Sequence, residues 1–199
     1  LLKPLALGAD ISIHSCTKYM NGHDDVMAGT VSVAGEAADS KQLLEAIRGA
    51  KTLFGPVLSP FEAWLLLRGM RTLGVRMSRH CENAAALAEA LEGSGKVEKV
   101  YYPGIEAHNA ASASRRLLRH GFGGMLSFEL KGGRDAVNKL ISGFKMTSFV
   151  PSLGSYATTI SHPASTSHRG LGEQERLRLG ITEGLIRVSV GIEDKKDIC

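Results

Sequence analysis

The sequence contains few cysteines and no long hydrophobic run. Its three cysteines, Cys16, Cys81 and Cys199, show no CxxC spacing, so they favour neither a disulfide framework nor a zinc site. No segment approaches the roughly 18 consecutive apolar residues of a membrane span. The opening LLKPLALGAD also lacks the basic front and the cleavage site of a secretory signal. We therefore expect a cytoplasmic protein that binds no metal and enters no membrane.

Motifs for nucleotide and nucleic-acid binding are missing as well. The glycines at 121–124 lack dinucleotide-binding spacing, and GITEG at 180–184 has no P-loop lysine. The net charge of +4 would permit nucleic-acid binding. Four arginines can share one side of a helix, namely Arg68, Arg71, Arg76 and Arg79. No aromatic interleaving accompanies them, so a solvated helix face or a subunit contact is the simpler interpretation, and we expect no nucleic-acid partner.

The 199 residues, of which 43% are apolar, are sufficient for a substantial core. The stretches ADISIHS (9–15) and GTVSVAG (29–35) alternate apolar and polar residues and predict two strands joined by a loop. A helix is expected over 38–51. The chain has no initiator Met and opens in the middle of an approach to a strand, so we expect a fragment of a protein about twice as long.

A second helix is predicted over SPFEAWLLLRGMRTL, residues 59–73. Ser59 can cap this helix, and Pro60 suits its first turn. Four of its apolar residues lie at core spacing: Phe61, Trp64, Leu65 and Met70. We expect them to be buried.

A third helical run, 75–92, is expected to bridge two domains that meet near residue 70. Beyond it, helices and strands alternate. The predicted strands are 96–104, 124–130, 148–154 and 185–193, and the predicted helices are 109–121 and 133–144. Three or four strands with two helices packed on them predict an α+β or α/β sandwich.

Lys18 is the first candidate for chemistry, because it follows a predicted strand in the stretch SIHSCTKYMNGHDDV (12–26). Side chains just past strand ends often line pockets in α/β proteins. A neutral lysine amine can condense with an aldehyde, and the hydroxyls of Ser15 and Thr17 suit a phosphate. Pyridoxal phosphate (PLP) carries both groups. Taken alone, a loop lysine is more often solvated than catalytic.

The lysine stretch DISIHSCTKYMNGHDDVMAG resembles the signature of the PLP-dependent Cys/Met metabolism enzymes, which include methionine and cystathionine γ-lyases, cystathionine γ-synthase and O-acylhomoserine sulfhydrylases. The resemblance continues in order through nearly the whole chain. The further stretches that carry it are SPFEAWLLLRGMRTL, GFGGMLSFEL, SLG, HPASTSH and GLIRVSVGIED. It implies the α/β fold of the type I PLP-dependent transferases. Residues 1–70 would end the large PLP-binding domain, and residues 71–199 would form the bridging helix and a small α/β sandwich.

The resemblance also implies roles for individual residues. Lys18 would bind the cofactor covalently and then move protons, while Ser15 and Thr17 would bind its phosphate. In LIRVSVGIE, Arg187 would bind the substrate α-carboxylate with two parallel hydrogen bonds. Ser152 and Ser167 would support that contact.

Each of these roles has a simpler alternative. Arg187 could form an ordinary surface ion pair, although its position between Ile186 and Val188 puts it opposite those apolar side chains. The two serines could shape turns. His162 and His168 do not share a helical face and favour no metal site. His23, Asp24 and Asp25 are expected to brace the lysine loop.

The resemblance implies a PLP-dependent carbon–sulfur lyase that acts by γ-elimination on methionine or cystathionine, as a homotetramer when full length. Relatives that use cystathionine tend to carry a glutamate where this chain has Pro151. Proline cannot pair with an ammonium group, which disfavours cystathionine as the preferred substrate. An O-acetylhomoserine sulfhydrylase or a cystathionine γ-synthase is the alternative within the family. An inactive fragment and a non-catalytic basic interaction module are the alternatives outside it.

Overall fold

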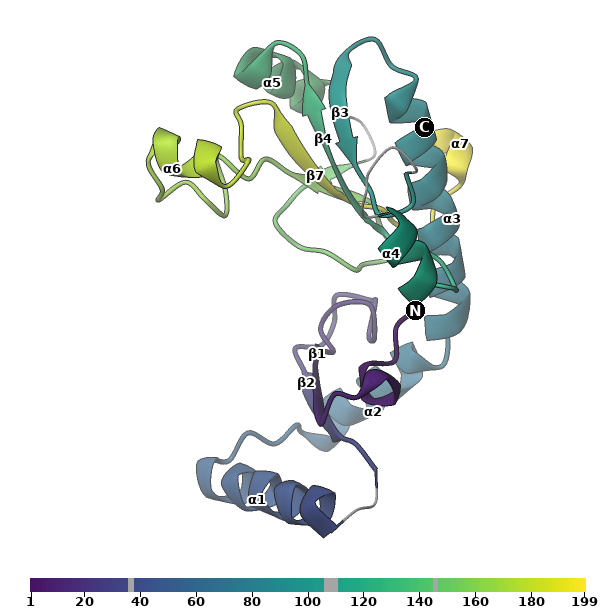
Figure 1. The fold of residues 1–199 in the computed structure, drawn as a ribbon, viewed down its shortest axis with the longest axis vertical. Helices are drawn as coiled ribbons and strands as arrows, with labels where there is room; N and C mark the ends of the chain where they lie inside the picture. The colour runs from purple at the N-terminus through teal and green to yellow at the C-terminus, as the bar shows by residue number, and fades with distance from the viewer. Residues whose placement is uncertain (36–37, 106–110, 145–146) are drawn as a thin grey trace. The chain divides into compact units, whose positions relative to one another are not determined.

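The computed structural model describes residues 1–35, 38–105, 111–144 and 147–199. Their contacts divide the chain into two compact units (Figure 1). Leu2–Leu73 form the unit that contains Lys18, which we call the lysine unit. Leu1 and Gly74–Cys199 form the other, which we call the sheet unit. The division falls between Leu73 and Gly74, where we had predicted a boundary near residue 70. The assignment of the units to a large and a small domain stays a prediction.

The lysine unit combines a two-stranded antiparallel sheet with short and long helices. Its elements are the 3-10 helix η1 (Pro4–Leu7), the strands β1 (Ile11–Ser15) and β2 (Gly29–Val33), and the helices α1 (Ala38–Phe54) and α2 (Pro60–Met70). The register pairs Ser15 with Gly29, so the two ends of the loop that joins the strands lie next to each other. Both strands lie where the alternation predicted them.

Helix α2 begins as predicted but buries a different face. Ser59 accepts a hydrogen bond from the N–H of Glu62, whose carboxylate accepts one from Ser59 in return. Phe61 and Trp64 were predicted to be buried, but they are 66% and 55% exposed. Their rings stack at 5.9 Å. The prediction was wrong because apolar spacing defines a face of a helix without saying what covers it.

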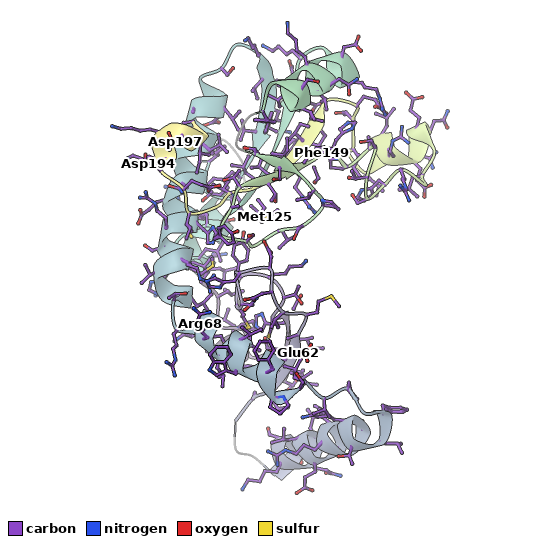
Figure 2. All side chains as sticks on the ribbon, turned by 180° about the vertical axis from the view of Figure 1, so that it is seen from behind. Glu62, Arg68, Met125, Phe149, Asp194 and Asp197 are labelled. Carbon is purple, nitrogen blue, oxygen red and sulfur yellow. The ribbon has the colours of Figure 1, made fainter. Side chains whose placement is uncertain are left out.

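The end of this helix carries a second correction. Met70 is 40% exposed, and Leu66 and Gly69 are the buried residues of α2. Arg68, which is labelled in Figure 2, lies over the ring of Trp64 at 5.9 Å from its centroid. The predicted arginine face is divided between two helices, because α2 ends at Met70 and α3 (Leu73–Glu92) carries Arg76, which is buried.

The sheet unit is built on a five-stranded mixed sheet with the strand order β3-β4-β7-β6-β5. Its strands are β3 (Val97–Tyr101), β4 (Met125–Leu130), β5 (Ser148–Phe149), β6 (Thr159–Ser161) and β7 (Leu185–Ser189). Only β5 and β6 pair in parallel; the other neighbours are antiparallel. The helices are α3, α4 (Ala111–Leu117), α5 (Gly133–Gly143), α6 (Glu173–Arg178) and α7 (Lys195–Ile198). β7 is therefore the central strand.

The main core lies on one face of this sheet. Ala84 and Ala88 of α3 and Val137 of α5 pack with Ile186 and Val188 of β7. The α7 helix lies beside α3, and α6 lies on the other side of the sheet (Figure 1). Since alternate residues of a strand face opposite ways, the second face of β7 carries Leu185, Arg187 and Ser189.

The structure contains a strand that the sequence did not predict and shortens others. The strands predicted over 96–104 and 185–193 are restricted to β3 and β7. The strand predicted over 148–154 is restricted to β5, and Pro151–Gly154 are loop. β6 was missed because three residues are too few for an alternating pattern to be recognised. No helix in the described part of the chain is long and apolar enough to cross a membrane.

Candidate active site

The lysine loop, defined as residues 16–28, leaves β1 and returns to β2. Its ends are joined at one peptide group, because the carbonyl oxygen of Ala28 accepts hydrogen bonds from the N–H of Cys16 (2.8 Å) and of Thr17 (3.2 Å). Cys16 is fully buried in an apolar cluster with Val26 and Leu66. A loop that is closed at its base and anchored in this way presents its side chains in a defined arrangement.

Lys18 lies in the first turn of this loop. Its N–H donates to the carbonyl oxygen of Ser15 (3.3 Å), and its own carbonyl accepts from the N–H of Gly22 (2.8 Å). The side chain is half-buried. Among the described residues its amine nitrogen has no hydrogen-bond or ion-pair partner. The backbone of Lys18 is thus fixed, and its amine is free of partners within the described residues and can bind or react with a ligand.

The two hydroxyls predicted to bind phosphate are engaged differently. Ser15 is exposed, and its hydroxyl forms no hydrogen bond within the described ranges. The hydroxyl of Thr17 accepts a hydrogen bond from the N–H of Ala28 (3.0 Å) and donates a long one to the carbonyl oxygen of Ala28 (3.4 Å). Ser15 is therefore available to an anion, whereas Thr17 also closes the loop.

The middle of the lysine loop packs against α2. The buried Asn21 donates from Nδ2 to Asp25 (2.7 Å), and His23 Nδ1 donates to the carbonyl oxygen of Asn21 (2.6 Å). A Cβ atom on Gly69 of α2 would overlap that same carbonyl oxygen. Glycine at 69 permits the close approach of the helix. His23 and Asp25 thus brace the loop, in agreement with the prediction for this segment.

Arg187 lies in the middle of β7, on the face opposite the core. Its Nη2 donates to the carbonyl oxygens of Pro151 (3.1 Å) and Ser152 (3.3 Å). Within the described residues no carboxylate lies at ion-pair distance from the guanidinium. A half-buried guanidinium without an acidic partner can receive a carboxylate through its remaining N–H groups.

Small hydroxyl side chains surround Arg187 on its face of the sheet. The register places Ser127 of β4 and Ser161 of β6 directly opposite Arg187, and residues opposite each other share a face. Thr159 and Ser189 form the next pair along the two strands. Neither Ser127 nor Ser161 was predicted to belong to the site, since their proximity to Arg187 follows from strand pairing and not from a motif.

The two serines predicted to support the substrate carboxylate are placed differently. Ser152 meets Arg187 through its carbonyl oxygen, which also accepts a hydrogen bond from Thr159 Oγ1 (3.3 Å). Ser167 is exposed, and its hydroxyl bonds to Nδ1 of the adjacent His168 (2.8 Å). The structure thus joins Ser152 to Arg187, whereas the bond of Ser167 is local.

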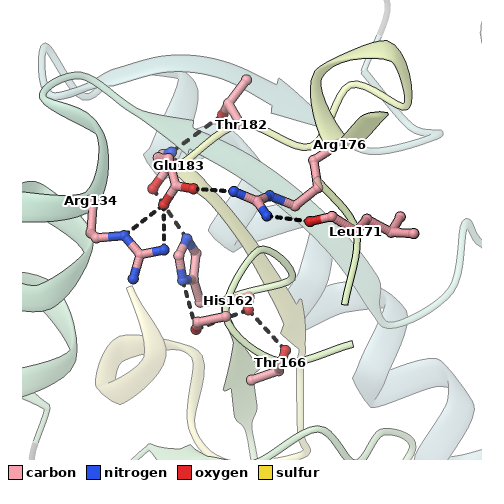
Figure 3. Close-up of polar contacts among 9 residues, drawn as sticks. Arg134, His162, Thr166, Leu171, Arg176, Thr182 and Glu183 are labelled. Carbon is pink, nitrogen blue, oxygen red and sulfur yellow. Dashed lines mark hydrogen bonds and ion pairs between the residues drawn. The ribbon is translucent and has the colours of Figure 1, made fainter. Parts of the chain in front are cut away.

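A charge cluster fixes the segment 162–184 to the rest of the sheet unit (Figure 3). The carboxylate of Glu183 binds Arg134 of α5 (2.7 Å) and Arg176 of α6 (2.8 Å). Arg176 also donates to the carbonyl oxygen of Leu171 (2.7 Å). Hydrogen bonding to Arg134 lowers the pKa of Glu183, so this carboxylate stays charged.

His162 lies next to this cluster and is buried (Figure 3). Its Nε2 donates to the carbonyl oxygen of Glu183 (3.1 Å), and its Nδ1 accepts from the hydroxyl of Ser165 (2.8 Å). Burial lowers the pKa of His162, which keeps the imidazole neutral near pH 7. No group of three potential metal-binding side chains occurs among the residues that the structure describes.

The segment 162–184 also packs on the sheet face that carries Arg187. Ala164 and Ile181 form an apolar cluster with Leu185. Leu185 precedes Arg187 by two residues in β7, so both side chains point to the same face. The HPASTSH stretch therefore belongs to the surroundings of that face.

The whole chain is similar to known proteins. Residues 1–199 match the family model described as Cys/Met metabolism PLP-dependent enzyme. The chain belongs to this family. Similar Cys/Met metabolism enzymes include L-methionine gamma-lyase of Fusobacterium nucleatum subsp. polymorphum, 46% identical over 196 residues, and O-succinylhomoserine sulfhydrylase of Pseudomonas aeruginosa, 46% identical over 198 residues. The matches cover 98% and 100% of this chain but 48% and 47% of those proteins.

Solved structures of Cys/Met metabolism enzymes have the same fold. Cystathionine gamma synthase from Xanthomonas oryzae pv. oryzae matches with a TM-score of 0.89 and 43% identity, covering 100% of this chain and 50% of that one. Cystathionine gamma-lyase from Lactobacillus plantarum matches with a TM-score of 0.90 and 37% identity, covering 99% and 50%. The predicted α/β fold class is confirmed. The chain spans about half the length of the relatives it matches.

The cofactor of the Cys/Met metabolism family is PLP, as predicted. The residues of the lysine loop fit this group. The amine of Lys18 and the hydroxyl of Ser15 lack partners among the described residues and are available to an aldehyde and a phosphate. Thr17 fits less directly, because a phosphate bond would replace its 3.4 Å bond to Ala28.

Proposed function

We propose that the full-length protein is a PLP-dependent carbon–sulfur lyase that acts on sulfur amino acids by γ-elimination. The observation that carries the proposal is the half-buried Lys18, whose backbone is bonded on both sides and whose amine has no partner among the described residues. Several L-methionine gamma-lyases that are 42% to 46% identical to the chain support it. The proposed activity resembles that of methionine γ-lyase or cystathionine γ-lyase.

We assign the roles as follows. When bound, PLP supplies an electron sink for the negative charge that develops at the α-carbon of an amino acid. Lys18 binds the cofactor aldehyde, and its amine, once released, accepts the α proton and returns a proton to the product. Ser15 binds the phosphate through its exposed hydroxyl, and Thr17 contributes by exchanging its long bond to Ala28 for one to the phosphate.

Arg187 binds the α-carboxylate of the substrate. Nη2 is occupied by the carbonyl oxygens of Pro151 and Ser152, so the N–H groups of Nε and Nη1 remain for the carboxylate. Ser152 fixes the guanidinium through its carbonyl oxygen. Ser167, from the segment 162–184, supports the same contact between Arg187 and the carboxylate. Pro151 offers no partner for a distal ammonium, which favours a short substrate such as methionine over cystathionine.

Replacement at Cγ is the second candidate reaction. The similarity to O-succinylhomoserine sulfhydrylase of Pseudomonas aeruginosa is the observation that favours it. The same Lys18 and Arg187 would serve both reactions, because elimination and replacement differ in what reacts after the leaving group departs. An assay separates them: 2-oxobutanoate, ammonia and methanethiol form from methionine and water in elimination, while sulfide and an O-acylhomoserine are consumed in replacement.

We further propose that the full-length protein is a cytoplasmic homotetramer without nucleic-acid or membrane partners. The outer face of α2 supports an interface, because Phe61, Trp64 and Leu67 are between 55% and 66% exposed and large apolar side chains in contact with each other favour burial. The molar mass in solution, measured by light scattering, tests this. A monomer whose Trp64 fluorescence is unaffected by dilution would exclude it.

The site assignment is tested by borohydride reduction of the full-length protein with PLP, followed by peptide mapping. We expect the label on Lys18 and on no other lysine. A label elsewhere, or salt-sensitive nucleic-acid binding without any label, would favour the basic interaction module instead.

A further inference from the structure

The loop from Pro151 to Thr158, which we call the arginine loop, begins with the two carbonyl groups that bind Arg187. It contains no helix or strand and leads into β6. A segment without regular structure depends on contacts with other segments for its shape. The direction of the Arg187 guanidinium therefore depends on whatever fixes this loop.

The end of β7 supplies two of these contacts. The hydroxyl of Ser189 accepts a hydrogen bond from the N–H of Gly154 (2.9 Å), and the N–H of Ile192 donates to the carbonyl oxygen of Tyr156 (2.8 Å). A Cβ atom on Gly191 would overlap this carbonyl oxygen of Tyr156. The loop thus packs directly against the backbone that follows β7.

Glu193 makes the strongest contact. One carboxylate oxygen accepts from the N–H of Thr158, and the other accepts from the hydroxyl of Thr158 (2.9 Å). The same hydroxyl accepts a hydrogen bond from the N–H of Gly191 (2.9 Å). Hydrogen bonds to a charged acceptor are stronger than neutral ones. Among the described residues Glu193 has no ion-pair partner.

The backbone that carries Glu193 is itself fixed by α3. Asn83 donates from Nδ2 to the carbonyl oxygens of Gly191 (3.0 Å) and Glu193 (2.9 Å). His80 Nδ1 donates to the carbonyl oxygen of Val190 (2.7 Å). Both side chains are fully buried, so they are well fixed. Glu193 therefore connects a rigid helix to the end of the arginine loop.

We infer that Glu193 is a positioning residue for Arg187: by fixing Thr158 it keeps the arginine loop in the conformation in which the Pro151 and Ser152 carbonyl groups orient the guanidinium. This rests on the proposed function, because the effect is on the binding of a substrate carboxylate. Glu193 touches neither substrate nor cofactor in this assignment. Its loss weakens carboxylate binding specifically.

The test measures ligand affinity by calorimetry in the full-length, PLP-loaded protein. Norleucine is methionine with a methylene group in place of the sulfur, and pentylamine is norleucine without its carboxylate. In Glu193→Ala we expect norleucine to bind roughly tenfold more weakly, as for a lost charged hydrogen bond, with pentylamine changed by less than about twofold. Glu193→Gln keeps an acceptor for the Thr158 N–H and should lie in between.

Asp194 is the matched control, because it is the adjacent acid and caps α7 by accepting from the N–H of Lys196 (2.9 Å) (Figure 2). Asp194→Ala should leave both affinities unchanged. If Glu193→Ala does not fold, Thr158→Val takes its place, and Thr158→Ser must restore norleucine binding.

The outcomes separate the two claims. Equal affinity of the wild-type protein for norleucine and pentylamine would refute the proposed role of Arg187. Two results would overturn the inference about Glu193 alone. In the first, the wild-type protein prefers norleucine to pentylamine and Glu193→Ala keeps the same preference; in the second, Glu193→Ala loses affinity for both ligands equally.

Discussion

The lysine loop and the surroundings of Arg187 are stabilised in different ways. The loop depends on a few backbone hydrogen bonds, a small apolar cluster and the close approach of α2 at Gly69. Arg187 lies on the central strand of a sheet whose other face is the main core of its unit. Lys18 is therefore sensitive to local changes, whereas Arg187 is placed by a large core and oriented by loops.

The largest effect is expected from Lys18→Ala in the full-length protein. Loss of the amine should lower the lyase rate by at least about 10³-fold, because both cofactor attachment and proton transfer depend on it. The unfolding of the sheet unit should not change. Rate assays and differential scanning calorimetry check this, with the exposed Lys41→Ala as control. Retention of activity would remove Lys18 from the site.

Arg187→Lys should weaken substrate capture by roughly 10² to 10³-fold, because a lysine ammonium does not reproduce the planar set of N–H donors that binds the loop carbonyl groups and a carboxylate together. KM should rise far more than kcat falls. Arg178→Lys, an exposed change on α6, is the control and should have no effect. Steady-state kinetics measure the difference, and an unchanged KM would mean that the carboxylate binds elsewhere.

Gly69→Ala should destabilise the lysine loop by about 1–3 kcal/mol, as overpacking at a tight contact does. The added methyl group would overlap the carbonyl oxygen of Asn21. Hydrogen exchange of residues 16–28 should accelerate while β7 stays protected. Gly49→Ala in α1 has open space and should be neutral or slightly stabilising. Equal behaviour of the two variants would show that α2 does not fix the loop.

The effect of pH should be confined to the sheet unit. Burial is the main cause that lowers the pKa of His80 and of His162 below 6.5. As pH falls below 6.5 the unfolded chain takes up these protons first, so the free energy of unfolding falls by about 1.4 kcal/mol per pH unit for each histidine until its lowered pKa is reached. The pKa of Glu183 is also lowered, so this carboxylate adds to the loss of stability only as pH falls below its ordinary value of 4.5.

Urea unfolding between pH 6.5 and 4.5 measures this slope. In His162→Gln this slope should fall by the contribution of one histidine. The neighbouring charges of Arg134, Arg176 and Glu183 remain in this variant. A slope that is unchanged in this variant would contradict a neutral, buried His162.

Long periodic elements and the motif residues could be predicted from the sequence. β1, β2, β4 and the helices α1, α2, α3 and α5 have enough residues for their patterns to show, and the resemblance around Lys18 and Arg187 located both residues. β6 and α6 are too short for periodicity to reveal them. Their absence from the prediction also hid Ser161 next to Arg187.

The remaining differences come from contacts that are distant in sequence. The hydroxyl of Thr17 bonds to Ala28, which neither motif nor spacing indicates. The apolar residues Phe61 and Trp64 follow the pattern of a buried helix face but are exposed within their unit. A single chain's hydrophobic pattern does not distinguish a core face from an interface.

Arg187 is oriented by the main-chain oxygens of Pro151 and Ser152 rather than by their side chains. Any amino acid supplies the same carbonyl group. The side chain at position 151 can therefore be exchanged to suit a longer or a differently charged amino acid without disturbing the anchor for the carboxylate. In the proposed function, substrate preference and carboxylate recognition can therefore change independently, although they depend on the same short stretch of chain.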